Sequence, residues 1–322
     1  MGKRMSVVAG ICLVLSMCLG GAAAAAFPEE NIHWIVGFKP GGGFDIYSRA
    51  IAQSMEKFLP DGVHVVVENH PGSASQQAAS MVYNADPDGY TIGIWPMPGL
   101  YVPQMFLDKK YDARKVTWLG TVLREPMCLA ISKTATFRTL KDLQAADVVR
   151  ITLTGFTGPE IAAPITLETL GIKAKYITGH KNSKESILAA MRGDGDAMIL
   201  TYGTMRKHIL KGDFIPVLLL GDKQRNPEIP EVPTATEAGY PQLDELVAAW
   251  RSIGGPPGIA PDRTQFLRDL LWKAMHDEEF VAWSKKSKRP VVALNAEQTE
   301  AGLKAVLTRY EDLRPLLKKY IQ

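Results

Sequence analysis

The sequence is poor in cysteine and, beyond its first segment, has no long apolar run. Only three of the 322 residues are cysteines, and Cys12 and Cys18 lie in the N-terminal apolar segment, so Cys128 alone remains beyond it. One thiol cannot form an internal disulfide. No later segment offers the roughly 18 uninterrupted apolar residues that a membrane span needs. We therefore expect a fold that its hydrophobic core holds together without a disulfide.

The first 26 residues have the layout of a secretory signal peptide. Lys3 and Arg4 precede an apolar segment, and a run of alanines ends just before Phe27. This order of basic, apolar and small residues predicts export to the periplasm, with cleavage near Ala26. Cys18 suggests a lipoprotein anchor as an alternative, but the large Met17 precedes it where such cleavage sites want a small residue.

Charge and motifs exclude several function classes. The net charge of +3 is small and the basic residues are scattered, so the sequence predicts no nucleic-acid partner. The sequence contains no G-x-S-x-G, H-E-x-x-H, G-x-G-x-x-G or P-loop pattern, and its histidines have no metal-ligand spacing. We therefore predict no catalytic residue, metal or cofactor. His70 and His180 both fall in turns, which leaves a site containing both open.

Strands and helices alternate along the chain beyond the signal peptide, which predicts an α/β fold with a mostly parallel sheet. The predicted strands are Ile32–Phe38, Val63–Glu68, Tyr90–Trp95, Val148–Leu153, Lys175–Ile177, Ala197–Leu200 and Ile215–Leu220. The predicted helices are Asp45–Phe58, Gln76–Asn84, Glu160–Leu170, Ser183–Arg192 and a helical C-terminus from Arg263. The chain exceeds the usual size of one core, so two domains are expected. In such sheets ligands bind beyond the carboxyl ends of the strands.

Three glycine-containing turns follow predicted strands at that edge. The first, Pro40–Gly43, leads into a helix whose predicted N-cap is Asp45. The second is Asn69–Ser75, and the third is Thr154–Pro159 in the later half of the chain. The first turn of a helix has unpaired N–H groups and the positive end of the helix dipole. A carboxylate or phosphate can bind there without an arginine.

Five segments give a more specific signal because they occur together. They are FKPGGGFD (Phe38–Asp45), VVVENHPGSAS (Val65–Ser75), DPDGYTI (Asp86–Ile92), IPEVPTATEAGYP (Ile229–Pro241) and GGPPGIAPD (Gly254–Asp262). In this order they resemble the extracytoplasmic solute-binding receptors of tripartite tricarboxylate transporters, the Bug family. The resemblance implies a two-domain flytrap of the periplasmic-binding-protein type II kind, with a mostly parallel sheet in each domain. Such a receptor closes on an organic carboxylate and delivers it to membrane permease subunits.

The resemblance also implies a domain organisation and a set of site residues. Domain 1 is expected to comprise residues 27–124 and 247–322, and domain 2 residues 125–246, in a monomer. The implied ligand-binding residues of domain 1 are Phe38, Gly41, Gly42, Gly43, Phe44, Asp45, Ser73, Ala74, Ser75 and Gln76. Those of domain 2 are Thr157, Gly158, Asp196 and Tyr202. Asp45 is expected to brace its turn, because its charge would repel a bound carboxylate.

Two departures from the family pattern bear on the ligand. Phe44 stands where the family has a small or hydroxyl residue, and PGSASQQ replaces a glycine-rich PGAGG followed by asparagine. Our hypothesis is a ligand with an apolar or aromatic body, against a wall that Phe38, Trp95, Phe156 and Tyr202 extend. The alternative is that these aromatic residues belong to the core. Two other functions remain open at this stage, a sensor for a membrane signalling protein and an exported hydrolase.

Overall fold

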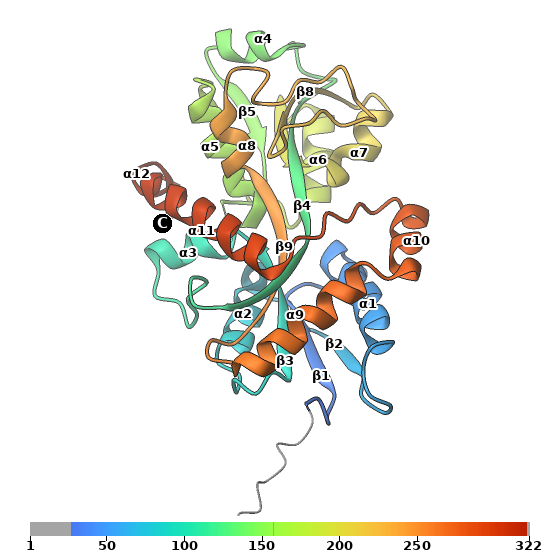
Figure 1. Ribbon diagram of the computed structural model, residues 1–322. Coiled ribbons are helices and arrows are strands. Elements are labelled where there is room, and N and C mark those ends of the chain that lie inside the picture. Colours follow the sequence, from blue (N-terminus) through green and yellow to red (C-terminus); the bar gives the residue numbers. More distant parts are fainter. Residues whose placement is uncertain (1–26, 157, 321–322) are drawn as a thin grey trace, which may run out of the picture.

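The computed structural model describes residues 27–156 and 158–320. The predicted signal peptide and Thr157 therefore lie outside the described residues. Two halves, each made of strands covered by helices, are joined by the long strands β4 (Thr117–Ser132) and β9 (Ala248–Gly255) (Figure 1). One nine-stranded sheet runs through both halves in the order β2-β1-β3-β9-β4-β7-β5-β6, and β8 pairs with β4.

The remaining elements follow the predicted alternation closely. The other strands are β1 (Ile32–Val36), β2 (Val65–Asn69), β3 (Thr91–Met97), β5 (Val149–Thr152), β6 (Ala174–Ile177), β7 (Ala197–Thr201) and β8 (Phe214–Leu220). The helices of the first half up to β4 are α1 (Gly43–Glu56), η1 (Ser73–Ser75), α2 (Gln76–Tyr83) and α3 (Tyr101–Phe106). Between β4 and β9 lie α4 (Leu140–Ala145), η2 (Gly158–Ile161), α5 (Ala162–Thr169), α6 (Ser183–Arg192), α7 (Tyr202–Leu210) and α8 (Pro241–Leu246). The chain ends with α9 (Pro261–Met275), α10 (Glu278–Ser287), α11 (Ala296–Asp312) and α12 (Arg314–Leu317).

The sheet is mixed, which corrects the prediction of a mostly parallel sheet in each half. Strand β1 pairs in parallel with β2 and β3, and β5 pairs in parallel with β6 and β7. Strand β9, however, runs antiparallel to β3 and β4, and β4 runs antiparallel to β7 and β8. The difference arises because β4 carries the chain from the first half to the second and β9 carries it back.

The long strand β4 changes partner where the two halves meet. It pairs with β9 as far as Pro126, and from Met127 onward it pairs with β7 and β8. Because side chains alternate between the faces of a strand, neighbouring residues here point to opposite sides of the sheet. Arg124 lies over the Trp250 ring, with 5.5 Å from the guanidinium carbon to the ring centroid, whereas Glu125 pairs with Arg251.

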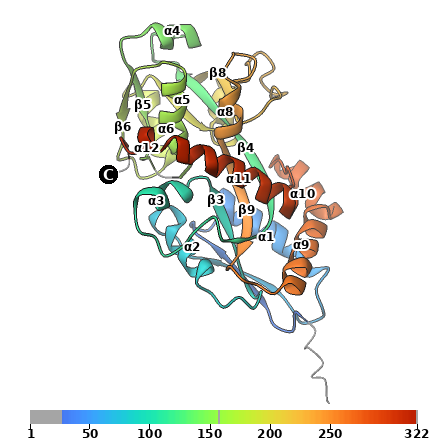
Figure 2. The same cartoon turned by 60° about the vertical axis from the view of Figure 1, so that its left-hand side comes forward.

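Helix α11 crosses β4 and β9 at this junction (Figures 1 and 2). Leu303 and Val306 of α11 belong to a buried cluster that includes Trp95 of the first half and Leu129 of the second. Gly302 lies directly against Trp250, since a Cβ atom on Gly302 would come within 2.5 Å of the indole ring. The helix therefore packs closely because residue 302 has no side chain.

Within the two described ranges, every helix is too short or too polar to cross a lipid bilayer.

We predict that Gly302→Ala lowers the free energy of unfolding, although alanine favours helices. Helix propensity alone would stabilise the variant by about 1 kcal/mol. The clash with Trp250 costs roughly 1–3 kcal/mol instead, because an overpacked core must shift. Chemical denaturation of both proteins measures the difference. Ala301→Gly, at the neighbouring exposed position, is the control for propensity, and a stabilised Gly302→Ala protein would contradict the packing described here.

Candidate functional site

The first strand-to-helix turn has the backbone geometry of an anion site. Gly41 has a φ of +79°, a left-handed conformation that glycine adopts without strain. Gly42 is the N-cap of α1 and provides no side-chain acceptor, so the N–H groups of the first helical turn have no capping partner. Among the described α-helices, side-chain oxygens cap α4, α6, α10 and α11, and the others share with α1 the lack of a side-chain cap.

Asp45 braces this turn, although it is not the N-cap that the sequence predicts. Its Oδ2 accepts a hydrogen bond from the Gly41 N–H at 2.8 Å. Its Oδ1 accepts from Arg49 Nε and from Asn69 Nδ2, both at 2.9 Å. Burial tends to raise the pKa of Asp45, but these hydrogen bonds and the charge of Arg49 hold it below its ordinary value. The carboxylate is therefore ionised and fully engaged within the protein.

Asn69 joins the first turn to the second. It ends β2, and its amide nitrogen donates both to Asp45 and, at 3.0 Å, to the Phe38 carbonyl oxygen. Strands β1 and β2 are parallel neighbours, so the turns that follow them lie at the same edge of the sheet. Asn69 lies within a segment that carries the family resemblance, but sequence analysis assigned it no role.

In the second turn, three consecutive residues other than glycine adopt a left-handed conformation. Ser73, Ala74 and Ser75 have φ values of 46°, 51° and 76°. Such values cost a residue with a Cβ roughly 1–2 kcal/mol each, and two of these positions are glycine in the family pattern. The Ser75 hydroxyl is buried against Gly37 and makes no hydrogen bond within the described chain. Helix α2 then begins at Gln76 with no side-chain cap, and the Gln76 N–H donates to the Ser73 carbonyl oxygen.

The third turn, in the second half, is braced by Glu160. Its carboxylate accepts hydrogen bonds from the backbone N–H and the hydroxyl of Thr154. Burial raises the pKa of Glu160, and the hydrogen bonds from Thr154 oppose that shift. Gly158 begins η2, while Thr157 lies outside the described residues.

The structure does not bring Asp196 to the other predicted residues. Asp196 lies at the amino end of β7, and its carboxylate pairs with Arg150 at 2.6 Å. Tyr202 lies at the opposite, carboxyl end of β7, where α7 begins. Its hydroxyl donates to Glu228 at 3.1 Å. Asp196 therefore acts in an ion pair at the far edge of the sheet, and we leave it out of the candidate site.

The aromatic residues divide between the site and the core. Phe38 and Phe44 stack with ring centroids 4.4 Å apart beside the first turn, where both are partly buried. Trp95 is 1% exposed and donates its indole N–H to Gly254, so it is a core residue. The ring centroid of Phe156 lies 5.2 Å from that of Tyr176 and 5.0 Å from that of Tyr320, near the C-terminus.

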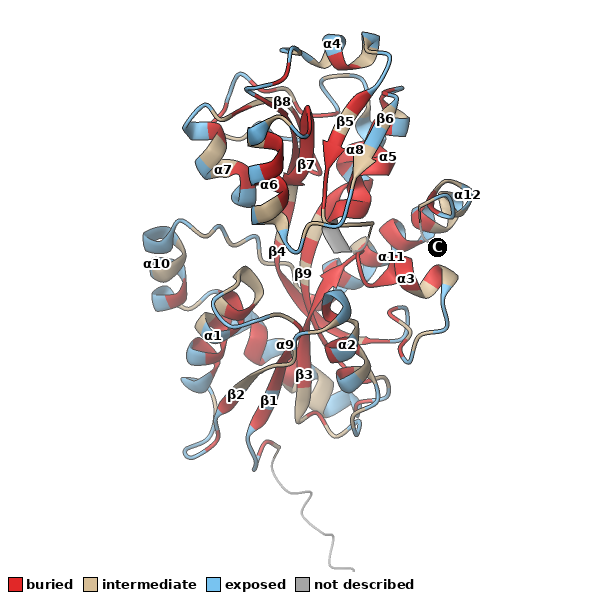
Figure 3. Cartoon of the chain, turned by 180° about the vertical axis from the view of Figure 1, so that it is seen from behind, coloured by how far each residue is buried: buried red, intermediate tan, exposed pale blue. Residues whose placement is uncertain are grey.

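An ion pair that sequence analysis missed lies between the two halves. Arg251 of β9 donates to Glu125 of β4 at 2.9 Å, and the two side chains are only 14% and 9% exposed. The other Glu125 oxygen accepts from the Gly203 N–H at the start of α7, at 3.1 Å. The sequence offered little signal, because neither residue falls in a recognisable strand or motif. Figure 3 shows the starts of α1 and α2 facing the second half across this junction.

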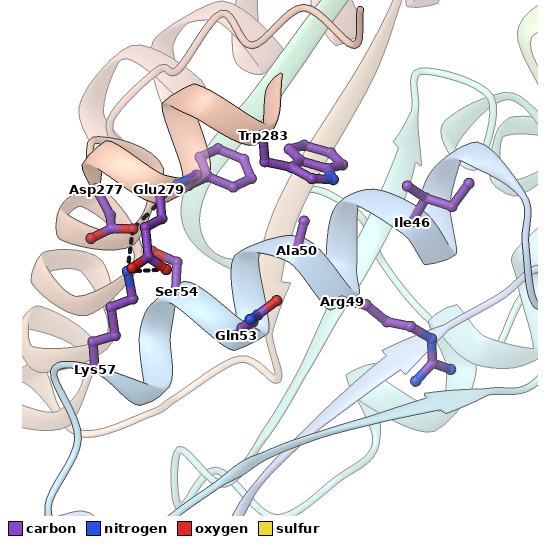
Figure 4. A pocket seen from close by; sticks show the side chains of 10 residues that line it. Ile46, Arg49, Ala50, Gln53, Ser54, Lys57, Asp277, Glu279 and Trp283 are labelled. Atoms are coloured by element: carbon purple, nitrogen blue, oxygen red, sulfur yellow. Dashed lines mark hydrogen bonds and ion pairs between the residues drawn. The ribbon is translucent and has the colours of Figure 1, made fainter. Parts of the chain in front are cut away.

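A separate groove of about 420 Å³ lies between α1 and α10 (Figure 4). Lys57 at the end of this groove pairs with Asp277 and Glu279, each at 2.8 Å. These pairs tie α10 to α1 on the outside of the first half. Across residues 27–156 and 158–320, no group of three or more histidine, cysteine or acidic side chains could hold a metal ion.

We predict that Asp45→Asn lowers the free energy of unfolding by roughly 2 kcal/mol near pH 7, because charge-assisted hydrogen bonds are lost. The folded-state pKa of Asp45 lies below the unfolded value, so its stabilisation is present above about pH 5 and declines as the pH falls below about 4. Denaturation of both proteins between pH 3 and pH 7 measures this. Asp61→Asn, at an exposed position, is the control. A difference that does not change with pH would contradict the role given to Asp45.

Comparison with known proteins identifies the family of this chain. The profile described as "Tripartite tricarboxylate transporter family receptor" matches residues 47–313. A relative from Pseudomonas sp. (strain P51), the "UPF0065 protein in tcbD-tcbE intergenic region", is 28% identical over 281 residues. The match covers 84% of this chain and 82% of the relative.

Solved structures match the fold over nearly their whole length. The periplasmic binding protein BugD has a TM-score of 0.72 at 22% identity, covering 90% of this chain and 98% of BugD. MatC from Rhodopseudomonas palustris, solved with bound malate, has a TM-score of 0.72 at 21% identity, covering 90% and 100%. These matches confirm the predicted α/β fold of the periplasmic-binding-protein type. The chain belongs to the tripartite tricarboxylate transporter family of solute-binding receptors.

Proposed function

We propose that this receptor captures an organic carboxylate between its two halves and delivers it to a tripartite membrane permease. The observation that carries the proposal is the pair of uncapped helix starts, α1 and α2, which follow parallel neighbouring strands. The first N–H groups of α1 suit an anion, and the dipoles of both helices add positive potential. Asp45 supports the proposal because its own charge is already engaged by Gly41, Arg49 and Asn69.

The proposed mechanism is closure of two domains on the ligand. We assign residues 27–124 and 247–322 to the first domain and residues 125–246 to the second, with β4 and β9 as the hinge. Hinges of this kind are a few residues at the ends of elements. Closure would exclude water, so that fixed amide dipoles replace the hydration shell of the carboxylate. The mature receptor would begin near Phe27, in the periplasm, after removal of the signal peptide.

The ligand class follows from the shape of the site rather than from its amide donors. Backbone N–H groups can donate hydrogen bonds to any carboxylate. The malate bound to MatC shows that a related fold holds a dicarboxylate. Here the Phe38–Phe44 stack adds an apolar surface beside the first turn. We propose a dicarboxylate or an aromatic acid as the ligand. Binding followed by release, without chemical change, is the role proposed for the site.

The direct test is thermal unfolding of the chain from Phe27 with a panel of acids. Adipate, malate, citrate and benzoate are the probes, and phosphate and amino acids are the controls. A ligand at about a hundred times its dissociation constant adds roughly 2.7 kcal/mol, which raises the midpoint by several degrees. We expect a rise with one carboxylate class and no turnover of the acid. A rise with the controls alone, or consumption of the acid, would overturn the proposal.

We predict that Phe44→Ser weakens the binding of benzoate more than that of adipate. Removing the ring takes away an apolar surface worth roughly 1–3 kcal/mol to a ligand that packs on it. Isothermal titration with both acids measures the ratio of affinities. Phe58→Ser, at an exposed position just beyond the C-terminal end of α1, is the matched control. An unchanged ranking of the two acids would show that Phe44 does not select the ligand.

A further inference from the structure

We infer that Arg251 binds the ligand carboxylate directly and that Glu125 is an intramolecular competitor for its guanidinium. This inference deepens the proposed function and rests on it. It assigns a charged binding residue to a site that the sequence describes only through backbone amides. The Glu125–Arg251 pair would let a ligand act on both halves at once.

Arg251 lies at the start of α1. Its guanidinium lies flat against the start of α1, because a Cβ atom on Gly43 would be 3.3 Å from the nearest terminal nitrogen. The guanidinium carbon is 5.0 Å from the Phe44 ring centroid and 4.9 Å from that of Tyr47. An anion on the first N–H groups of α1 would therefore meet a fixed positive charge. Aromatic faces hold that charge in place.

The Arg251 guanidinium is only partly hydrogen-bonded within the described chain. Only one terminal nitrogen of Arg251 has a hydrogen-bond partner, Glu125, and its Nε is buried with no partner in the described chain. A guanidinium has five N–H donors and prefers to bind a carboxylate through two of them. Arg251 therefore keeps donors for an incoming acid. The acid would also compete with Glu125 for the nitrogen that is already engaged.

Glu125 contacts both halves of the protein. One carboxylate oxygen accepts from Arg251, which lies against α1, and the other accepts from Gly203 at the start of α7. If a ligand carboxylate takes Arg251, Glu125 still has its partner at the α7 dipole. In the absence of ligand, the Glu125 carboxylate thus engages Arg251 in place of the ligand carboxylate. Its exchange would couple binding at α1 to the contact with α7.

The test uses acetate, the smallest carboxylate, with the chain from Phe27. Melting midpoints are measured from 0 to 100 mM sodium acetate, with chloride keeping the ionic strength constant. Glu125→Gln removes the competing charge and keeps an amide oxygen for Gly203. We expect this variant to bind acetate on the order of tenfold more tightly than the wild type, the value of one charge-assisted hydrogen bond.

Two further variants make the result specific. We expect no acetate response beyond chloride in Arg251→Gln, and none in the double variant E125Q/R251Q. Glu245→Gln, which breaks an exposed pair with Arg309, is the matched charge control and should behave as the wild type. Circular dichroism checks that each protein is folded, and the single variant E125Q decides the matter if the Arg251 variants do not fold.

The outcomes separate this inference from the proposed function. An acetate response in E125Q equal to that of the wild type, or a gain that persists in the double variant, would overturn the inference. A gain that needs Arg251, together with no response of the wild type to adipate, malate, citrate or benzoate, would support the ion-pair exchange. That second result would at the same time overturn the receptor proposal.

Discussion

The Asp45 carboxylate accepts hydrogen bonds from groups on two different strand-to-helix turns, and the geometry of the site depends on this interaction. It engages Gly41 of the first turn and Asn69 at the end of β2. A buried carboxylate without such partners would cost several kcal/mol, so its partners are held firmly. Asp45 is therefore turned away from the N–H groups at the start of α1, which remain uncapped by side chains. The proposed anion site thus contains an acidic residue whose charge is engaged within the protein and does not repel the anion.

The second constraint is the passage of β4 and β9 between the halves. These strands present Arg124 and Trp250 to one face, where Gly302 of α11 packs against Trp250, and Glu125 and Arg251 to the other. The covered face is apolar and closely packed at Gly302. The opposite face holds a charged pair with few exposed atoms at the boundary where a ligand would enter. The same two strands thus serve stability on one face and, in our proposal, ligand recognition on the other.

The sequence predicted the parts of this structure that local pattern governs. Alternating apolar runs and glycine turns located β1, β2 and β3 within a few residues, and α6 at its observed bounds. Strands β4 and β9 were not predicted, because Gly120, Pro126 and charged residues interrupt their apolar pattern. Only contacts with strands distant in sequence make those segments strands.

The candidate site was predictable to a similar degree. The two turns of the first half were found because glycine, proline and helix starts leave local signatures. The Glu125–Arg251 pair joins residues 126 positions apart, and no local pattern points to it. The resemblance suggested Asp196 as a site residue, but Asp196 lies at the amino end of β7, where it pairs with Arg150. The left-handed Ser73–Ser75 turn also has no signal in its residue types, which disfavour that conformation.

The central claim is that a carboxylate lies on the starts of α1 and α2, between the two halves. The most direct measurement is a crystal structure of the chain from Phe27 with the acid that stabilises it most. Our account predicts a carboxylate within hydrogen-bond distance of backbone N–H groups between Gly42 and Asp45, with the second turn completing its contacts. An acid bound in the groove between α1 and α10, or one that leaves both turns uncontacted, would contradict the account.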